Sequence, residues 1–139
     1  MNIDSIQNGI VLDHIAAGRG MQIYDTLRLQ ELDCTVAIIK NVKSAKMGRK
    51  DIIKIDETID LDLDVLGFID RDITVNIICG GKLTEKRRLH PPAQLVNVIR
   101  CKNPRCITTV EHSADHIFRL TQGERPVYRC IYCESAYSN

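Results

Sequence analysis

Residues 101–106 read CKNPRC and residues 130–133 read CIYC, so four cysteines stand in two close pairs with 23 residues between them. Each pair can fold into a tight knuckle that presents two thiolates, and the spacer can bring both knuckles around one ion. Soft thiolates, with no carboxylate or imidazole at a matching spacing, favour zinc. The pattern therefore predicts a structural zinc site with no open position for catalysis, held by Cys101, Cys106, Cys130 and Cys133.

Two disulfides, or plain buried thiols, are the alternative for these four cysteines. The N-terminus carries no stretch that resembles a secretory signal, and the thiols of a cytosolic chain stay reduced. We therefore expect a cytoplasmic protein whose clustered cysteines bind metal. Two further cysteines, Cys34 and Cys79, stand alone in apolar stretches, where we expect small buried side chains.

Length and composition argue against several classes of protein. The chain has 139 residues, which suffices for one ordinary domain or two small ones. A net charge of +1, with 4% aromatic residues and no Trp, argues against a nucleic-acid-binding protein. No apolar run approaches the roughly 20 residues that a membrane-spanning helix needs. We therefore expect neither nucleic acid nor a membrane as a partner.

Hydrophobic periodicity in the first ninety residues predicts two helices and five strands. The expected elements are a strand at 10–15, a helix at 21–32, strands at 35–42 and 49–56, a helix from Asp60, and strands at 73–79 and 82–89 joined by a Gly80-Gly81 turn. This order matches a ferredoxin-like split βαβ unit with one extra strand. The fold class is therefore α+β, beginning with a ferredoxin-like α/β sandwich in which an antiparallel sheet carries two helices.

The two expected helices each have an apolar stripe. In the first helix, the side chains expected on one face are Ile23, Tyr24 and Leu27. In the second helix, the expected buried stripe is Leu61, Val65, Phe68 and Ile69. Three aspartates crowd the start of the second helix, where the helix dipole favours negative charge. We interpret this run as a solvated helix start and not as a metal site.

Pro91 and Pro92 interrupt this pattern and stiffen the connection, so we place a domain boundary there. The expected domains are residues 1–92 and 93–139. The second should be a small all-β zinc-binding domain, with strands at 96–100, 108–112, 117–121 and 127–133. A domain of roughly 45 residues is too small for a self-sufficient core, so the metal should supply much of its stability.

The strand at 49–56 has two chemically different faces. Alternation places Lys50, Ile52 and Lys54 on one face, and Asp51, Ile53 and Ile55 on the other. Two ammonium groups beside an aliphatic side chain suit a ligand with phosphates and a flat ring. The side chains of Lys86, Asp13 and His14 could also contact such a ligand. A solvated lysine face on an exposed sheet is the alternative, and the spacing leaves both open. No phosphate-binding glycine loop and no catalytic motif is present, so we expect no enzyme activity.

Six segments in the same order resemble the regulatory chain family of aspartate carbamoyltransferase: NGIVLDHI (8–15), MGRKDIIKI (47–55), ITVNII (73–78), GKLTEK (81–86), CKNPRCIT (101–108) and CIYCE (130–134). The resemblance implies a non-catalytic regulatory subunit in pyrimidine biosynthesis. Its first domain would bind the effectors CTP and ATP, with UTP assisting CTP in some members. Its zinc domain would dock on the catalytic chain, in a complex where homodimers of the regulatory chain bridge catalytic trimers.

The resemblance also implies positions for the functional residues. The nucleotide site would be formed by Ile3, Asp4, Ile6, Asp13, His14, Lys50, Ile52, Lys54, Asn76, Ile78, Leu83 and Lys86. The catalytic-chain contact would centre on residues 102–105 and on Glu134. A different class of function, a zinc-ribbon adaptor for nucleic acid, is the alternative that the four cysteines and the basic residues of the first knuckle leave open.

Overall fold

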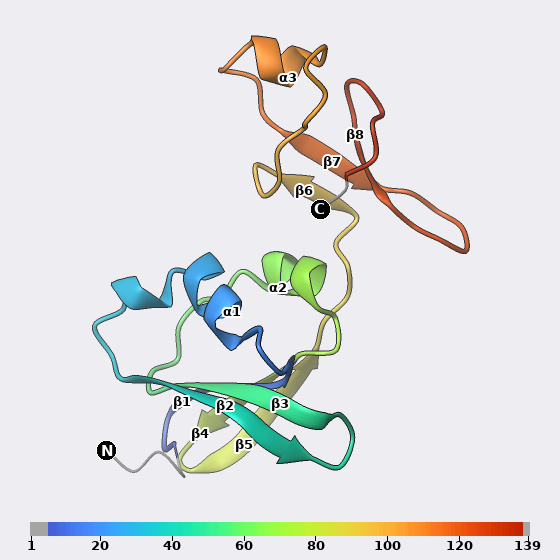
Figure 1. Ribbon diagram of the computed structural model, residues 1–139. Helices are drawn as coiled ribbons and strands as arrows, with labels where there is room; N and C mark the ends of the chain where they lie inside the picture. The colour runs from blue at the N-terminus through green and yellow to red at the C-terminus, as the bar shows by residue number, and fades with distance from the viewer. Residues whose placement is uncertain (1–5, 138–139) are drawn as a thin grey trace. The chain divides into compact units, whose positions relative to one another are not determined.

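The computed structural model describes residues 6–137 and separates the chain into two compact units, Met1–His90 and Pro91–Asn139 (Figure 1). The first unit is an antiparallel sheet with helices on one face. The second is a smaller sheet with a cysteine cluster. The fold class expected from the sequence, α+β with a small β-rich metal-binding part at the C-terminal end, is confirmed.

The sheet of the first unit has five strands in the order β2-β3-β1-β4-β5, and every neighbouring pair is antiparallel. The strands are β1 (Gly9–Ala16), β2 (Val36–Ser44), β3 (Gly48–Ile55), β4 (Thr74–Cys79) and β5 (Lys82–Arg88). Helices α1 (Gly20–Thr26) and α2 (Leu63–Ile69) lie on the same side of this sheet (Figure 1). Among residues 6–137, no helix of the first unit lies on the other face, which is called the open face below.

The core lies between the helices and the sheet. Its fully buried members include Ile10, Leu12 and Ile15 of β1 and Ile53 and Ile55 of β3. The side chains of β1 that face the core belong to even-numbered residues up to Leu12 and to the odd-numbered Ile15 after it. The change occurs because a bulge interrupts the pairing of β1 with β3 between Leu12 and Ile15. The bulge leaves the side chains of Ile10, Leu12 and Ile15 all in the core.

Helix α1 is shorter than the sequence predicts. It ends at Thr26, and Arg28 then adopts a left-handed conformation (φ 55°) before a short 3-10 helix, η1 (Leu29–Glu31). The expected apolar face is confirmed, because Ile23 is fully buried and Tyr24 and Leu27 pack against the core. Arg28 thus divides the helix expected at 21–32 into α1 and η1, which both pack against the core.

Helix α2 is capped by one of the three crowded aspartates. The Asp62 carboxylate accepts a hydrogen bond from the backbone N–H of Val65 at 3.2 Å, and the neighbouring aspartates are exposed. The solvated helix start is therefore confirmed. The predicted stripe is only partly right, because the fully buried side chain is Leu66, and Val65 and Phe68 are only half-buried. The helix begins at Leu63, three residues later than expected, which rotates its buried face.

The prediction of two buried isolated cysteines is wrong for Cys79. Cys34 is half-buried and packs against the core, whereas Cys79 is exposed at the end of β4. Gly80 and Gly81 follow it with φ of 60° and 77°, which is the conformation a tight hairpin turn requires. Cys79 therefore lies beside an exposed turn at the end of β4 and not in the core.

The second unit contains a three-stranded antiparallel sheet in the order β6-β7-β8. Its elements are β6 (Gln94–Val96), a four-residue helix α3 (Ile107–Val110), β7 (Ile117–Leu120) and β8 (Tyr128–Cys130). The strand predicted at 108–112 is wrong, because the Cys106 carbonyl accepts hydrogen bonds from the N–H groups of Thr109 and Val110 and closes a helical turn. The strand predicted at 96–100 is also wrong beyond Val96, because Asn97 turns the chain at φ 59°. Across residues 6–137, none of the helices is long and apolar enough to cross a membrane.

Asp51 is a fully buried carboxylate in the middle of the first unit. It accepts hydrogen bonds from the backbone N–H groups of Gly18 (3.1 Å), Gly20 (2.9 Å) and Asn41 (2.9 Å). Burial by itself would raise the pKa of Asp51, but these three donors outweigh it and hold the pKa below 3.8. One side chain thus ties the β1–α1 turn and strand β2 to β3.

We predict that Asp51→Ala destabilises the protein by about 3 kcal/mol or more, because it leaves three backbone donors without their acceptor. Urea unfolding measures the loss, and Asp56→Ala, which removes an exposed carboxylate just after β3, should cost about 0.5 kcal/mol or less. The stabilisation is complete above the unfolded pKa near 3.8 and is lost as the pH falls through the lower folded pKa. The variant should therefore depend less on pH below about pH 4, and a variant as stable as the wild type would contradict this role.

Candidate functional site

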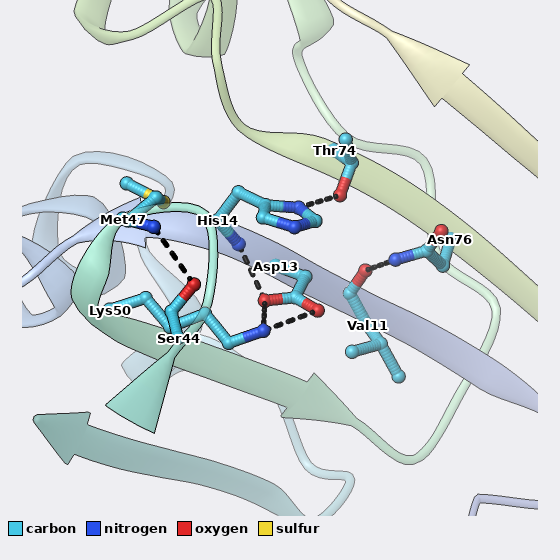
Figure 2. Close-up of polar contacts among 8 residues, drawn as sticks. All are labelled: Val11, Asp13, His14, Ser44, Met47, Lys50, Thr74 and Asn76. Atoms are coloured by element: carbon cyan, nitrogen blue, oxygen red, sulfur yellow. Dashed lines mark hydrogen bonds and ion pairs between the residues drawn. The ribbon is translucent and has the colours of Figure 1, made fainter. Parts of the chain in front are cut away.

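Four strands contribute to one row of side chains on the open face of the sheet. The strand register places Lys54 of β3 opposite Val11 of β1, Val11 opposite Asn76 of β4, and Asn76 opposite Lys86 of β5. Residues in register point to the same face. The Asn76 side chain donates to the Val11 carbonyl at 3.4 Å (Figure 2). Two ammonium groups and an amide therefore share one line across the sheet.

The end of the face toward the last residues of β4 is apolar. Ile78 of β4 lies opposite Gly9 of β1 on one side and opposite Leu83 of β5 on the other. Leu83 is 56% exposed, and Ile6 is buried beside Gly9. This end can accept a flat apolar group.

The opposite end of the face is polar, and the bulge in β1 forms it. The Asp13 carboxylate pairs with the Lys50 ammonium at 2.9 Å, and the His14 ring contacts the Thr74 hydroxyl at 3.0 Å (Figure 2). Burial alone would raise the pKa of Asp13, but Lys50 and the backbone N–H of His14 outweigh it and lower the pKa. Asp13 therefore stays ionised at neutral pH and can accept a hydrogen bond from a ligand hydroxyl.

A groove of about 330 Å³ adjoins this polar end. Most of the polar side chains that line it are basic or imidazole groups: Lys46, Arg71, Lys86, Arg88, His14 and His90. The only acidic residue among its lining is Asp72. With four ammonium or guanidinium groups and one carboxylate, the groove suits an anion with several charges.

The structure brings most of the predicted nucleotide residues onto this face. Alternation in β3 is confirmed, because Asp51, Ile53 and Ile55 are buried, whereas Lys50, Ile52 and Lys54 are only partly buried and lie on the other face. The remaining predicted residues on this face are Asp13, His14, Asn76, Ile78, Leu83 and Lys86. Ile6 lies beside it, and the predicted residues Ile3 and Asp4 lie outside the described part of the chain. Whether these side chains bind a nucleotide stays a prediction.

Several polar residues at the groove are absent from the sequence interpretation. Arg88 stands opposite Thr74, two residues beyond Lys86 on the same strand, so alternation along β5 could have found it. Lys46, Arg71 and His90 lie in turns or at the end of the unit. No periodic pattern marks such positions, and only the folded chain brings them together.

The four predicted metal ligands converge in the second unit. Their sulfur atoms all lie within 4.8 Å of one another. The Sγ–Sγ distance is 3.5 Å between Cys101 and Cys133 and 3.6 Å between Cys106 and Cys130. A disulfide needs about 2.05 Å, whereas tetrahedral zinc with bonds of about 2.3 Å places its sulfurs about 3.8 Å apart. The geometry fits a four-thiolate metal site and not a pair of disulfides.

Hydrogen bonds surround the sulfur atoms and orient both knuckles. The Thr108 hydroxyl of α3 donates to Cys106 Sγ at 3.1 Å, and the Cys101 N–H donates to the His116 ring at 3.2 Å. Hydrogen bonds from Ser135 lower the pKa of Cys133 to about 6, whereas burial raises the pKa of Cys101 to about 12. A bound cation would stabilise the thiolate that burial disfavours. His116 is a supporting residue that the cysteine spacing could not reveal.

The comparisons with known proteins match both units. The family model described as aspartate carbamoyltransferase regulatory chain, allosteric domain, matches residues 1–90, and the one described as its metal binding domain matches residues 93–139. The chain is 49% identical over 138 residues to a protein of Clostridium botulinum named aspartate carbamoyltransferase regulatory chain, covering 99% of this chain and 94% of the relative. Proteins of the same name from Clostridium tetani (49%, covering 99% and 96%) and Bifidobacterium longum (45%, covering 96% and 96%) are similar along nearly their whole lengths.

We predict that Cys106→Ala removes metal binding and unfolds the second unit only. Three thiolates hold zinc less well than four, and the small core cannot replace the ion. Zinc content and backbone NMR would show loss of the metal together with collapse of the signals of residues 91–139. The matched control is Cys79→Ala, which removes an exposed thiol from the first unit and should leave the metal in place. Full metal content and a folded second unit in Cys106→Ala would contradict the assignment.

Proposed function

The chain belongs to the family of aspartate carbamoyltransferase regulatory chains, and we propose that the open face of its first unit binds CTP and ATP and so controls the catalytic chain. It is a regulatory and not a catalytic chain, as the names of its relatives state. It has an allosteric domain and a metal-binding domain. The chain thus serves pyrimidine biosynthesis through regulation.

The change from apolar to basic along the open face carries the proposal. A nucleoside triphosphate has a flat base at one end and a polyanion at the other. The exposed Leu83 and its neighbour Ile78 suit the base, and the basic groove at His14 and Lys86 suits the phosphates. Asp13, held ionised by Lys50, lies at the polar end of the face and can accept a hydrogen bond from a ribose hydroxyl.

The row of Lys54 and Asn76 accounts for binding of two different bases. Cytosine and adenine both present ring nitrogens that accept hydrogen bonds, which an ammonium and an amide can donate. The two bases differ in size and in the hydrogen-bond donors and acceptors along their edges, so each would favour a different state of the complex. A ligand shifts such an equilibrium only by its differential affinity for the two states. UTP is the third candidate effector and would act together with CTP.

The second unit has a structural part in this proposal. Zinc held by Cys101, Cys106, Cys130 and Cys133 would keep the two knuckles in the form that docks on the catalytic chain. The residues of the first knuckle, Lys102 to Arg105, of which all but Asn103 are exposed, and Glu134 after the second would make that contact. Homodimers of this chain would bridge catalytic trimers in a cytoplasmic complex.

We predict that Lys54→Ala weakens both CTP and ATP by about tenfold or more, because a hydrogen bond from a charged donor contributes about 1.5–3 kcal/mol. Isothermal titration of the zinc-loaded chain with each nucleotide measures the change. The control is Lys43→Ala, which removes the same charge from an exposed position on β2 and should leave both affinities unchanged. Equal affinities in Lys54→Ala and the wild type would reject this placement of the base.

A further inference from the structure

We propose that Lys46 and Arg71 sense the number of phosphates on the effector, so that the site selects a triphosphate over a monophosphate. The inference rests on the proposed function and extends it to two residues outside the predicted site. Both line the basic groove next to His14. Neither lies on the strands that carry the base and sugar contacts.

The two residues come from separate turns that lie side by side in the fold. Lys46 lies in the turn between β2 and β3, and Arg71 lies in the turn between α2 and β4. Hydrogen bonds brace both turns: the Met47 N–H donates to Ser44 Oγ at 3.2 Å (Figure 2), and the Asp72 N–H donates to the side chain of Asp70 at 2.9 Å. The backbone under each cation is therefore held beside the groove.

The groove is larger than a single phosphate requires. Its volume is about 330 Å³, and its lining extends from Lys46 of the β2–β3 turn to Lys86 and Arg88 of β5. The cations on the strands, Lys86 and Arg88, stand in register with Asn76 and Thr74. Lys86 is the last member of the row that begins at Lys54, and Arg88 lies two residues beyond it on β5, so both are placed for the first phosphates. Lys46 and Arg71 then supply charge for the phosphates farther from the sugar.

The charges in the groove are not satisfied within the chain. Among residues 6–137, neither Lys46 nor Arg71 has a hydrogen bond or ion pair from its side chain to another residue. The groove holds four permanent cations and the single carboxylate of Asp72, which leaves a net charge of +3 when the histidines are not counted. Added phosphates bring added negative charge, and a site with excess positive charge favours the more highly charged ligand.

The test compares CTP, CDP and CMP by isothermal titration. We expect the double variant Lys46→Ala/Arg71→Ala to lose about three- to thirty-fold in affinity for CTP, as for two exposed ion contacts. It should lose less for CDP and remain within about twofold for CMP. Lys43→Ala/Arg125→Ala is the matched control, because it removes the same two charges from exposed positions outside the groove. Lys46→Arg/Arg71→Lys keeps both charges and should keep the preference for CTP.

An equal loss for CTP and CMP, or no loss for either, would overturn the proposal. Unchanged melting temperatures of the variants exclude a folding defect as the cause.

Binding of inorganic tripolyphosphate distinguishes failure of this proposal from failure of the proposed function. If no nucleotide binds the wild-type chain but tripolyphosphate binds it and not the double variant, the phosphate-sensing role stands and the nucleotide function fails. If tripolyphosphate and CTP bind the wild type and the double variant equally, the nucleotide function stands and the role of Lys46 and Arg71 fails. If none of these ligands binds the wild type, both proposals fail.

Discussion

The carboxylate of Asp51, with its three backbone hydrogen bonds, fixes which face of β3 is buried. Side chains alternate along a strand, so a slip of one residue would exchange the two faces. With Asp51 held inward, Lys50 and Lys54 must lie on the open face. The same carboxylate ties the β1–α1 turn to the sheet, just after the bulge that presents Asp13 and His14. A structural contact in the core thus positions the open face, the proposed ligand-binding face, on the other side of the sheet.

The sequence predicted those parts of the fold that a repeating pattern encodes. Alternation located all five strands of the first unit and the open face of β3, and cysteine spacing located the metal cluster. Prediction from the sequence failed where local hydrogen bonds decide the conformation of the backbone. Thr108 and Thr109 favour a strand by propensity, but the carbonyl of Cys106 and the knuckle before it close a helical turn there. Lys46 and Arg71 were missed because they stand in turns, where no period marks a residue that the fold brings into a site.

The two units are stabilised by different means, and this suits a regulatory chain. The first has a core of aliphatic side chains such as Leu12 and Leu66, large enough to leave one sheet face free for ligands. The second is built around four sulfur atoms and a three-stranded sheet. Metal binding can therefore control whether the second unit is folded without altering the first. The proposed function places nucleotide binding and attachment to a catalytic chain in separate parts of the sequence.

The most direct test of the regulatory role is the rate of carbamoyl-aspartate formation by the cognate catalytic trimer. The rate is measured for the trimer alone and with the zinc-loaded chain, first without nucleotide and then with CTP or ATP. The account predicts that the chain binds the trimer and that the two nucleotides then change the rate in different directions, with no effect on the trimer alone. A chain that does not bind the trimer, or a complex whose rate ignores both nucleotides, would contradict it.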